Sequence, residues 1–226
     1  MQLRSSGPLL ALAAALALLA ACHEGPTTAQ CFEPNATPYN FDYNLDTNIV
    51  FHWPPSYMPL RVYAESVGET PANTRKGMDL WVGAFRCHEL SYTMVSDSTR
   101  ADIIVRNPAS LPTAPPAHMV QMHADSDSVG ACEGVTQFDT ANGALVGPMR
   151  SYVATFPTTD SAAAAACYHF TTAHELGHAL GLLSESPDPN DLMNAVPWRL
   201  VLTEDDRFTI QLLYHTRSTL GPPPRR

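Results

Sequence analysis

The stretch SAAAAACYHFTTAHELGHALGLL, residues 161 to 183, constrains the fold of this chain more than any other. Asp160 or Ser161 can cap its first turn, and alanine and leucine favour a helix along its length. Gly181 tolerates the left-handed backbone conformation at which helices commonly end. We therefore expect one long helix that ends near Gly181. Three ionisable side chains stand among the apolar residues of its second half, so we expect this helix to carry chemistry as well as part of the core.

These ionisable side chains have the spacing of a zinc site. His174 and His178 are four residues apart, which places both imidazoles on one helix face with Cβ atoms about 5–6 Å apart. Zinc accepts imidazole nitrogen, and a catalytic zinc keeps three protein ligands and one position for water. Glu175 is offset around the helix, so it can reach that water as a general base without binding the metal. The pattern predicts a Zn²⁺ site that lacks only a third ligand.

The wider sequence resembles a known group of enzymes. HELGHALG, which ends at Gly181, is followed by a turn and Met193, and this is similar to the metzincin metalloproteases with their HExxHxxGxxH pattern and methionine turn. Within that group, SPDPNDLM at residues 186 to 193 is similar to the matrixin continuation HSxDPxALM. The resemblance covers roughly residues 50 to 215. It implies a single α/β (α+β) domain with a twisted, mostly parallel but mixed sheet of about five strands and three helices.

The chain departs from the family pattern at the third ligand. Counting forward from the first histidine reaches Ser184, whereas counting backward from the methionine of the turn reaches Glu185. The backward count matches a longer run of residues, and two histidines with one glutamate form a recognised catalytic zinc set. We therefore predict the metal ligands His174, His178 and Glu185, with Asp188 as the alternative if the turn folds differently. The competing interpretation is a solvated Glu185 in a turn, with a site that binds metal weakly or not at all.

Other segments have the periodicities of strands and amphipathic helices. Thr70 is the expected N-cap of a helix with Pro71 at its first position. A loop rich in Pro, Ala, His and Asp is expected from residue 108 to about 130. By family resemblance, a peptide substrate would lie along an edge strand near residues 134 to 136. The expected strands are 60–65, 90–96, 101–107, 134–138 and 144–155, and the expected helices are 70–85, 161–181 and 202–215.

The N-terminus has the pattern of a bacterial export signal. An uncharged run of Leu and Ala follows Arg4 and ends at Cys22, too short to cross a membrane comfortably. The small residues before Cys22 resemble a lipoprotein processing site, so we expect Cys22 to be lipidated in the cell envelope. An ordinary signal peptide and a secreted protein are the alternative. The expected division is 1–21 signal peptide, 22–49 lipidated N-terminus and tether, 50–217 metalloprotease domain and 218–226 disordered tail.

Cysteine usage and charge narrow the function further. With Cys22 assigned to a lipid, four of the five cysteines remain, which predicts two disulfides in one of three connectivities. Without residues 1–21 the chain has 12 Lys and Arg against 22 Asp and Glu, a net charge of −10. Such a surface is unfavourable for nucleic acid. We expect a protein or peptide substrate and a monomer anchored to the membrane by its N-terminal lipid.

Taken with the resemblance, these features predict an extracytoplasmic zinc endopeptidase in which Glu175 is the general base. Gly181 would allow the chain to double back after the zinc helix, and Met193 would close a tight turn beneath the metal. The alternative is a catalytically inactive metzincin-like protein that uses the same cleft to bind a partner in the cell envelope.

Overall fold

The computed structural model describes residues 31, 43–45, 47–112, 119–124 and 132–225, and structural statements below concern these residues. The expected signal peptide and Cys22 lie outside them. The helices are α3 (Thr70–Val82), α4 (Ser161–Leu180) and α5 (Glu204–Tyr214), and two short 3-10 turns are η1 (Pro55–Tyr57) and η2 (Ser98–Arg100). The strands are β1 (Tyr43–Leu45), β2 (Thr47–Ile49), β3 (Leu60–Ala64), β4 (Tyr92–Val95), β5 (Ile103–Arg106), β6 (Met119–Ala124), β7 (Cys132–Ala141), β8 (Ala144–Leu145) and β9 (Met149–Thr155).

The main sheet is mixed. Its strands follow the order β4-β3-β5-β9-β7-β6, and β8 pairs with β7 off this path. The neighbours from β4 to β9 are parallel, whereas β7 is antiparallel to both β9 and β6. β1 and β2 form a separate antiparallel pair. The predicted fold class, a single α/β domain with a mixed sheet and three helices, is confirmed.

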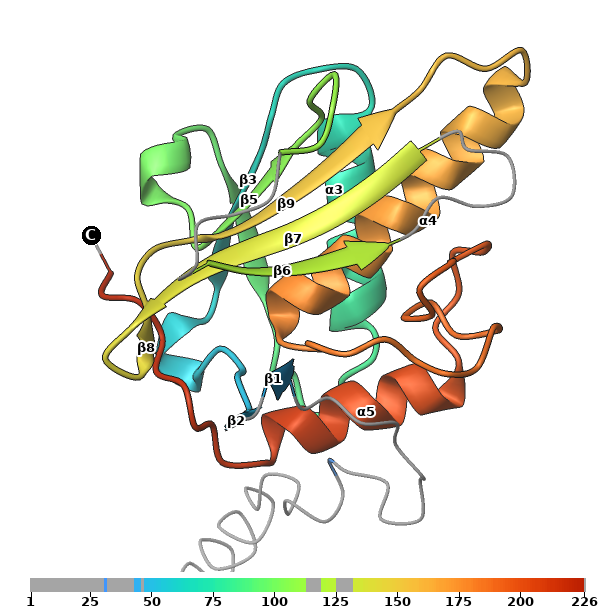
Figure 1. The fold of residues 1–226 in the computed structure, drawn as a ribbon. Coiled ribbons are helices and arrows are strands. Elements are labelled where there is room, and N and C mark those ends of the chain that lie inside the picture. The colour runs from blue at the N-terminus through green and yellow to red at the C-terminus, as the bar shows by residue number, and fades with distance from the viewer. Residues whose placement is uncertain (1–30, 32–42, 46, 113–118, 125–131, 226) are drawn as a thin grey trace, which may run out of the picture.

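The helices enclose the core against one face of the sheet. In Figure 1, α3 and α4 lie behind the sheet and α5 runs below it, and α4 contacts β7, β9, β6 and α3. Trp53 and Trp81 are fully buried. Their indole N–H groups donate to the carbonyl oxygens of Ala179 and Ala173, each at 2.8 Å. Two large side chains thereby fix α4, the helix with the predicted zinc ligands, relative to the rest of the core.

Two disulfides are present, as the cysteine count predicted. Cys31 pairs with Cys87 and Cys132 with Cys167, with Cα atoms 5.4 and 6.0 Å apart. The first joins the segment before the domain to the loop after α3. The second joins the start of β7 to α4, so it holds the strand and the helix together near the predicted site.

Three segments differ from expectation. The predicted loop 108–130 contains β6, which pairs with β7 from Met119↔Asp139 to Ala124↔Gly134. The edge at residues 134–136, where a peptide was expected, is therefore occupied by the chain itself. The expected tether contains the β1–β2 pair, and Glu69 rather than Thr70 is the N-cap of α3.

The expected disordered tail is also different, because residues 218–225 pack against the domain. The amide of Thr219 donates to the carbonyl of Val50 at 2.8 Å, and Gly221 forms a β-bridge with Ala144. Arg225, the last described residue, forms a salt bridge with Asp102, in which its Nη2 is 3.2 Å from the carboxylate. These contacts are between residues far apart in sequence, which is why local composition failed to predict them. Among the described helices, none combines the length and apolar character needed to cross a membrane.

Candidate metal centre

The helix α4 brings three ionisable side chains into the protein interior. Its first turn is capped by Asp160, whose carboxylate accepts from the amides of residues 162 and 163. It ends at Gly181, whose φ of 117° lies in the left-handed region that favours glycine. A Cβ at Gly181 would also collide with the backbone oxygen of Phe51. The helix therefore stops where the sequence predicted, and the chain turns back toward its own last two turns.

The two imidazoles are oriented by backbone carbonyls. His174 and His178 are fully buried, and their ring centroids are 4.6 Å apart. Nδ1 of His174 faces the carbonyl of Leu192 at 2.8 Å, and Nδ1 of His178 faces the carbonyl of Leu182 at 2.5 Å. A carbonyl only accepts, so Nδ1 carries the proton and donates, which leaves Nε2 of each ring with a lone pair when the ring is neutral. This is the arrangement in which histidines bind metals.

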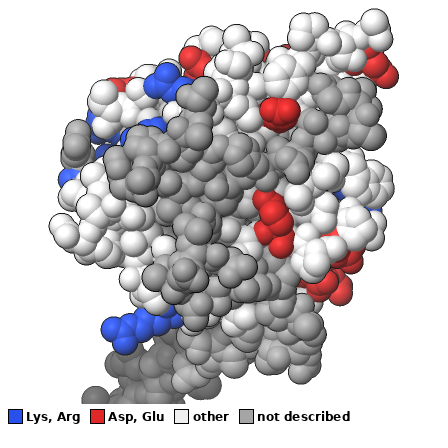
Figure 2. Space-filling model, viewed as in Figure 1, with Lys and Arg blue, Asp and Glu red and all other residues white. Residues whose placement is uncertain are grey.

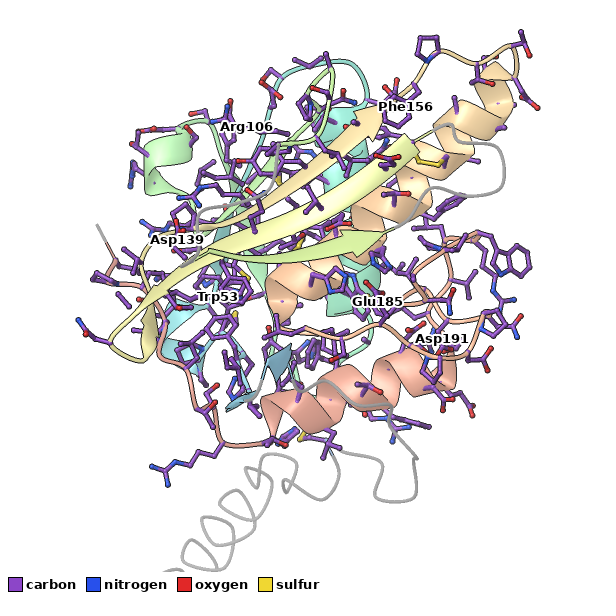
Figure 3. The ribbon with its side chains drawn as sticks, viewed as in Figure 1. Trp53, Arg106, Asp139, Phe156, Glu185 and Asp191 are labelled. Atoms are coloured by element: carbon purple, nitrogen blue, oxygen red, sulfur yellow. A yellow bond between two sulfur atoms is a disulfide. The ribbon has the colours of Figure 1, made fainter. Side chains whose placement is uncertain are left out.

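Glu185 lies opposite both Nε2 atoms. Its Oε1 is 3.1 Å from Nε2 of His178, and its Oε2 is 3.4 Å from Nε2 of His174. One ligand atom from each of the three residues lies within 4.8 Å of the others. The Glu185 side chain is 30% exposed whereas both imidazoles are 0% exposed, so solvent reaches the group from the glutamate side. Figure 3 shows Glu185 in the loop after α4, below β6.

The other candidates for the third ligand lie differently. Asp188 is exposed and groups with Asp191 and Asp205, away from the two imidazoles. Ser184 is half-buried, one residue before Glu185. Of the residues that sequence reasoning weighed, Glu185 is the one whose carboxylate faces both histidines. A third group of possible ligands combines Cys31 and Cys87 with Glu89, but both sulfurs are consumed in a disulfide.

The charges of this cluster change its pKa values. Burial alone would lower the pKa of His174, but the carboxylates of Glu185 and Glu175 outweigh it and raise the pKa to about 9. Burial would raise the pKa of Glu185, yet the two facing imidazoles hold it well below its usual range. Burial raises the pKa of Glu175, against the opposing effect of both imidazoles. Without a metal, the cluster therefore keeps a proton on His174 beside an ionised Glu185.

Three buried atoms of the centre lack a hydrogen-bond partner in the described part of the chain. They are Oε1 of Glu175, and Nε2 of His174 and Oε2 of Glu185, which face each other as an ion pair at 3.4 Å. An unsatisfied buried polar atom costs about 1–3 kcal/mol, so this concentration calls for a ligand. Two imidazole nitrogens and a carboxylate oxygen are a donor set that zinc accepts. The residues present fit a bound Zn²⁺.

The loop after α4 is held by a dense hydrogen-bond network. The amide of Ser186 donates to the carbonyl of Met193 at 2.7 Å. The carboxylate of Asp206, the N3 residue of the α5 capping box, accepts from the amides of Leu192 and Met193 at 2.8 and 3.2 Å. Met193 is fully buried, and its side chain lies so close to Gly177 of α4 that any Cβ there would strike its sulfur. Met193 thus closes a turn packed against the histidine-bearing helix, and α5 fixes the position of that turn.

The surroundings of Glu175 include residues whose role sequence reasoning missed. Thr136 of β7 donates from Oγ1 to Oε2 of Glu175 at 2.6 Å, and Ser151 of β9 contacts Thr136 at 2.9 Å. Gly134 leaves the space that the Glu175 carboxyl group fills, since a Cβ there would be 2.8 Å from Cδ of Glu175. A threonine and a serine in strands have no sequence signal of their own, because both are ordinary strand residues.

The molecular surface near this loop is acidic. In the face shown in Figure 2, a group of Asp and Glu side chains lies toward the right, over the segment between α4 and α5, while most visible Lys and Arg lie to the left. Local negative charge raises the concentration of cations and disfavours anionic partners.

No protein-family model matches this chain, and no curated protein matches it either.

Proposed function

We propose that this protein is a zinc-dependent endopeptidase of the metzincin type, close to the matrixins in its loop after the zinc helix. The observation that carries the proposal is the convergence of His174, His178 and Glu185. Beside them lies the buried carboxylate of Glu175, whose Oε1 has no hydrogen-bond partner among the described residues. The capped N-terminus of α4, its end at Gly181 and the buried turn at Met193 support the proposal. A salt bridge on the surface would require none of these features.

In this proposal the chain's own residues have separate tasks. Zn²⁺ held by the two imidazoles and Glu185 would acidify a bound water and polarise the carbonyl of the scissile peptide bond. Both histidines are kept in the binding tautomer by the carbonyls that accept from Nδ1. Glu175 accepts a proton at its unpaired Oε1 and returns it to the leaving amine. In the metal-free centre, burial raises the pKa of Glu175 and so favours a proton on this carboxylate.

The test compares zinc content and cleavage of an unfolded protein. Wild type should hold one zinc per chain and cleave. Glu175→Gln should keep the zinc and lose cleavage, because the amide cannot accept the proton. Glu185→Ala should lose both. Asp188→Ala, which removes a carboxylate from the same loop but not from the histidine group, is the matched control and should keep both.

Two results would contradict parts of the proposal. Full zinc retention by Glu185→Ala would refute the assignment of Glu185 as the third ligand. Loss of zinc in a Ser184→Ala or Asp188→Ala variant would instead assign the third ligand to the residue replaced. A wild-type protein that binds zinc and cleaves nothing would favour the alternative, a binding protein of the cell envelope that uses the same cleft. A protein without metal or activity would refute the enzyme altogether.

We also propose that the domain works outside the cytoplasm, anchored by a lipid on Cys22. The two disulfides support an oxidising compartment, and they involve the four cysteines other than Cys22. In a bacterial host, the Cys22→Ala variant should leave the membrane fraction and appear in soluble fractions. A wild-type protein that is soluble after export would contradict the anchor.

A further inference from the structure

A hydroxyl pair on two neighbouring strands holds one oxygen of Glu175. Thr136 and Ser151 are directly paired in the β7–β9 register, and both are fully buried. Oγ1 of Thr136 lies 2.6 Å from Oε2 of Glu175 and 3.0 Å from the backbone oxygen of the same residue. Oγ of Ser151 lies 2.9 Å from Oγ1 of Thr136. The other oxygen of Glu175, Oε1, has no partner in the described residues.

The single proton of each hydroxyl gives this pair a direction. The ionised carboxylate and the backbone carbonyl of Glu175 only accept. The proton of Thr136 therefore goes to the charged Oε2, which is its shortest contact and the strongest acceptor. Oγ of Ser151 also lies 3.3 Å from the backbone oxygen of Glu175, but its shorter contact, at 2.9 Å, is to Thr136. Donation along this shorter contact, to the lone pair of Thr136, orients the threonine hydroxyl toward the glutamate. The two hydroxyls form a short chain that ends on Oε2.

The strand and helix are matched over three successive positions. Residues 132, 134 and 136 lie on one face of β7 because side chains alternate along a strand, and residues 167, 171 and 175 lie on one face of α4. Cys132 is bonded to Cys167, Gly134 makes room at the second position, and Thr136 binds Glu175 at the third. A Cβ at residue 134 would be 2.7 Å from Cγ2 of the threonine at position 171. The disulfide and the glycine thus bring β7 close enough for its threonine to reach the carboxylate.

We propose that Thr136, oriented by Ser151, is a positioning residue for the general base of the reaction. It holds Oε2 of Glu175 and fixes the carboxylate rotamer, so that Oε1 stays free to accept the proton of the attacking water. This inference rests on the proposed peptidase function and adds to it a residue outside the metal ligands. A buried hydroxyl that served only to satisfy the sheet would leave turnover untouched when replaced.

The deciding variants are isosteric. Thr136→Val keeps the branched shape and removes the hydroxyl, and Thr136→Ser keeps the hydroxyl and removes a methyl group. Zinc content, melting temperature, kcat and KM on a peptide substrate should be measured for both. We expect Thr136→Val to keep one zinc per chain and its KM while kcat falls by roughly 10- to 100-fold, the range that misplacement of a catalytic group produces. Thr136→Ser should recover most of that loss.

Two further variants complete the experiment. Ser151→Ala removes the donor to Thr136 together with its longer, 3.3 Å contact to the backbone oxygen of Glu175, so it should lower kcat several-fold at unchanged zinc content. Thr74→Val removes another buried threonine hydroxyl, one that donates within α3 at 2.8 Å, and should leave kcat unchanged. If Thr136→Val does not fold, the comparison of Ser151→Ala with Thr74→Val decides the question.

The outcomes separate this inference from the proposed function. A cleaving wild type whose Thr136→Val variant keeps full kcat, or loses its zinc, would overturn the positioning role alone. The same holds if Ser151→Ala and Thr74→Val have equal, wild-type kcat. A wild-type protein that neither binds zinc nor cleaves would overturn the proposed function, and the positioning role with it.

Discussion

Without the proposed metal, the stability of this protein should depend on pH in a defined direction. In the metal-free fold, His174 has a pKa of about 9, compared with 6.5 for an ordinary histidine, since burial is outweighed by the facing carboxylates of Glu185 and Glu175. The native state therefore keeps a proton that the unfolded state releases above pH 6.5. A raised histidine pKa contributes stability that is complete below the unfolded value and is lost as pH rises through the folded value.

The expected size follows from these two pKa values. One pKa unit corresponds to about 1.4 kcal/mol, so the rise of His174 from 6.5 to about 9 is worth roughly 3 kcal/mol. The free energy of unfolding of the chelator-treated protein should fall by about that amount between pH 6.5 and pH values above 9. The lowered pKa of Glu185 acts in the opposite range, and its contribution is lost as pH falls below the ordinary glutamate value of 4.5.

Urea denaturation followed by tryptophan fluorescence at a series of pH values measures this dependence. The zinc-loaded protein should not lose stability in the same window, because the metal takes the place of the proton. Glu185→Gln should flatten most of the slope in the metal-free protein. Glu89→Gln removes a carboxylate that contacts His215 outside the centre, 3.1 Å from its Nε2, and should keep the slope. A metal-free wild type with constant stability from pH 6.5 to 9.5 would refute the coupling between His174 and Glu185.

Three other substitutions test the geometry around the centre. Gly134→Ala places a Cβ against the carboxyl group of the proposed base, so it should lower stability by about 1–3 kcal/mol and abolish most cleavage; wild-type turnover would contradict the close contact. Replacing Cys132 and Cys167 by serine removes a disulfide that spans a sequence separation of 35. The free energy of unfolding, measured by urea denaturation, should fall by about 4 kcal/mol. An unchanged value would mean that the pair is reduced in the native protein. Gly181→Ala should destabilise the fold more than Gly143→Ala. Both glycines have positive φ, but only at Gly181 would a Cβ strike a backbone oxygen. Equal melting temperatures of the two variants would argue against a tight turn at Gly181.

Local signals in the sequence predicted the elements that carry the centre. The capped, alanine-rich helix with its glycine stop is determined by residues that are neighbours in sequence, so propensity and capping rules suffice to find it. The capping residues of the last helix are local in the same way, and that helix begins at Glu204 within the predicted range. The histidine spacing follows from helix geometry alone. These are the parts of the fold for which each residue's preference agrees with the final structure.

Long-range pairings could not be predicted in this way. β6 lies in a segment rich in proline and alanine and is a strand because β7 offers it an edge, which no local pattern in residues 119–124 reveals. The C-terminal tail is ordered for the same kind of reason, since its partners at Val50 and Ala144 are distant in sequence. The disulfide connectivity likewise depends on which strand crosses which helix. The two counts toward the third ligand, from His174 and from Met193, disagreed for a related reason. Residue spacing predicts where a side chain lies within a regular helix or strand, but not across the irregular loop that follows α4.

The polar atoms of the centre are less completely hydrogen-bonded than those of the loop beside it. Elsewhere the loop after α4 satisfies its buried groups closely, as the bonds of Asp206 to two backbone amides show. In the centre, Oε1 of Glu175 has no hydrogen-bond partner among the described residues, and Nε2 of His174 and Oε2 of Glu185 have only each other, across 3.4 Å. Selection for stability alone would remove such atoms or pair them, because each costs about 1–3 kcal/mol. Asn73 and Gln211 also keep such atoms elsewhere in the described chain, so the indication of function lies in the chemistry of the donors at the centre. An imidazole nitrogen and two carboxylate oxygens suit the metal and the water of the proposed peptidase.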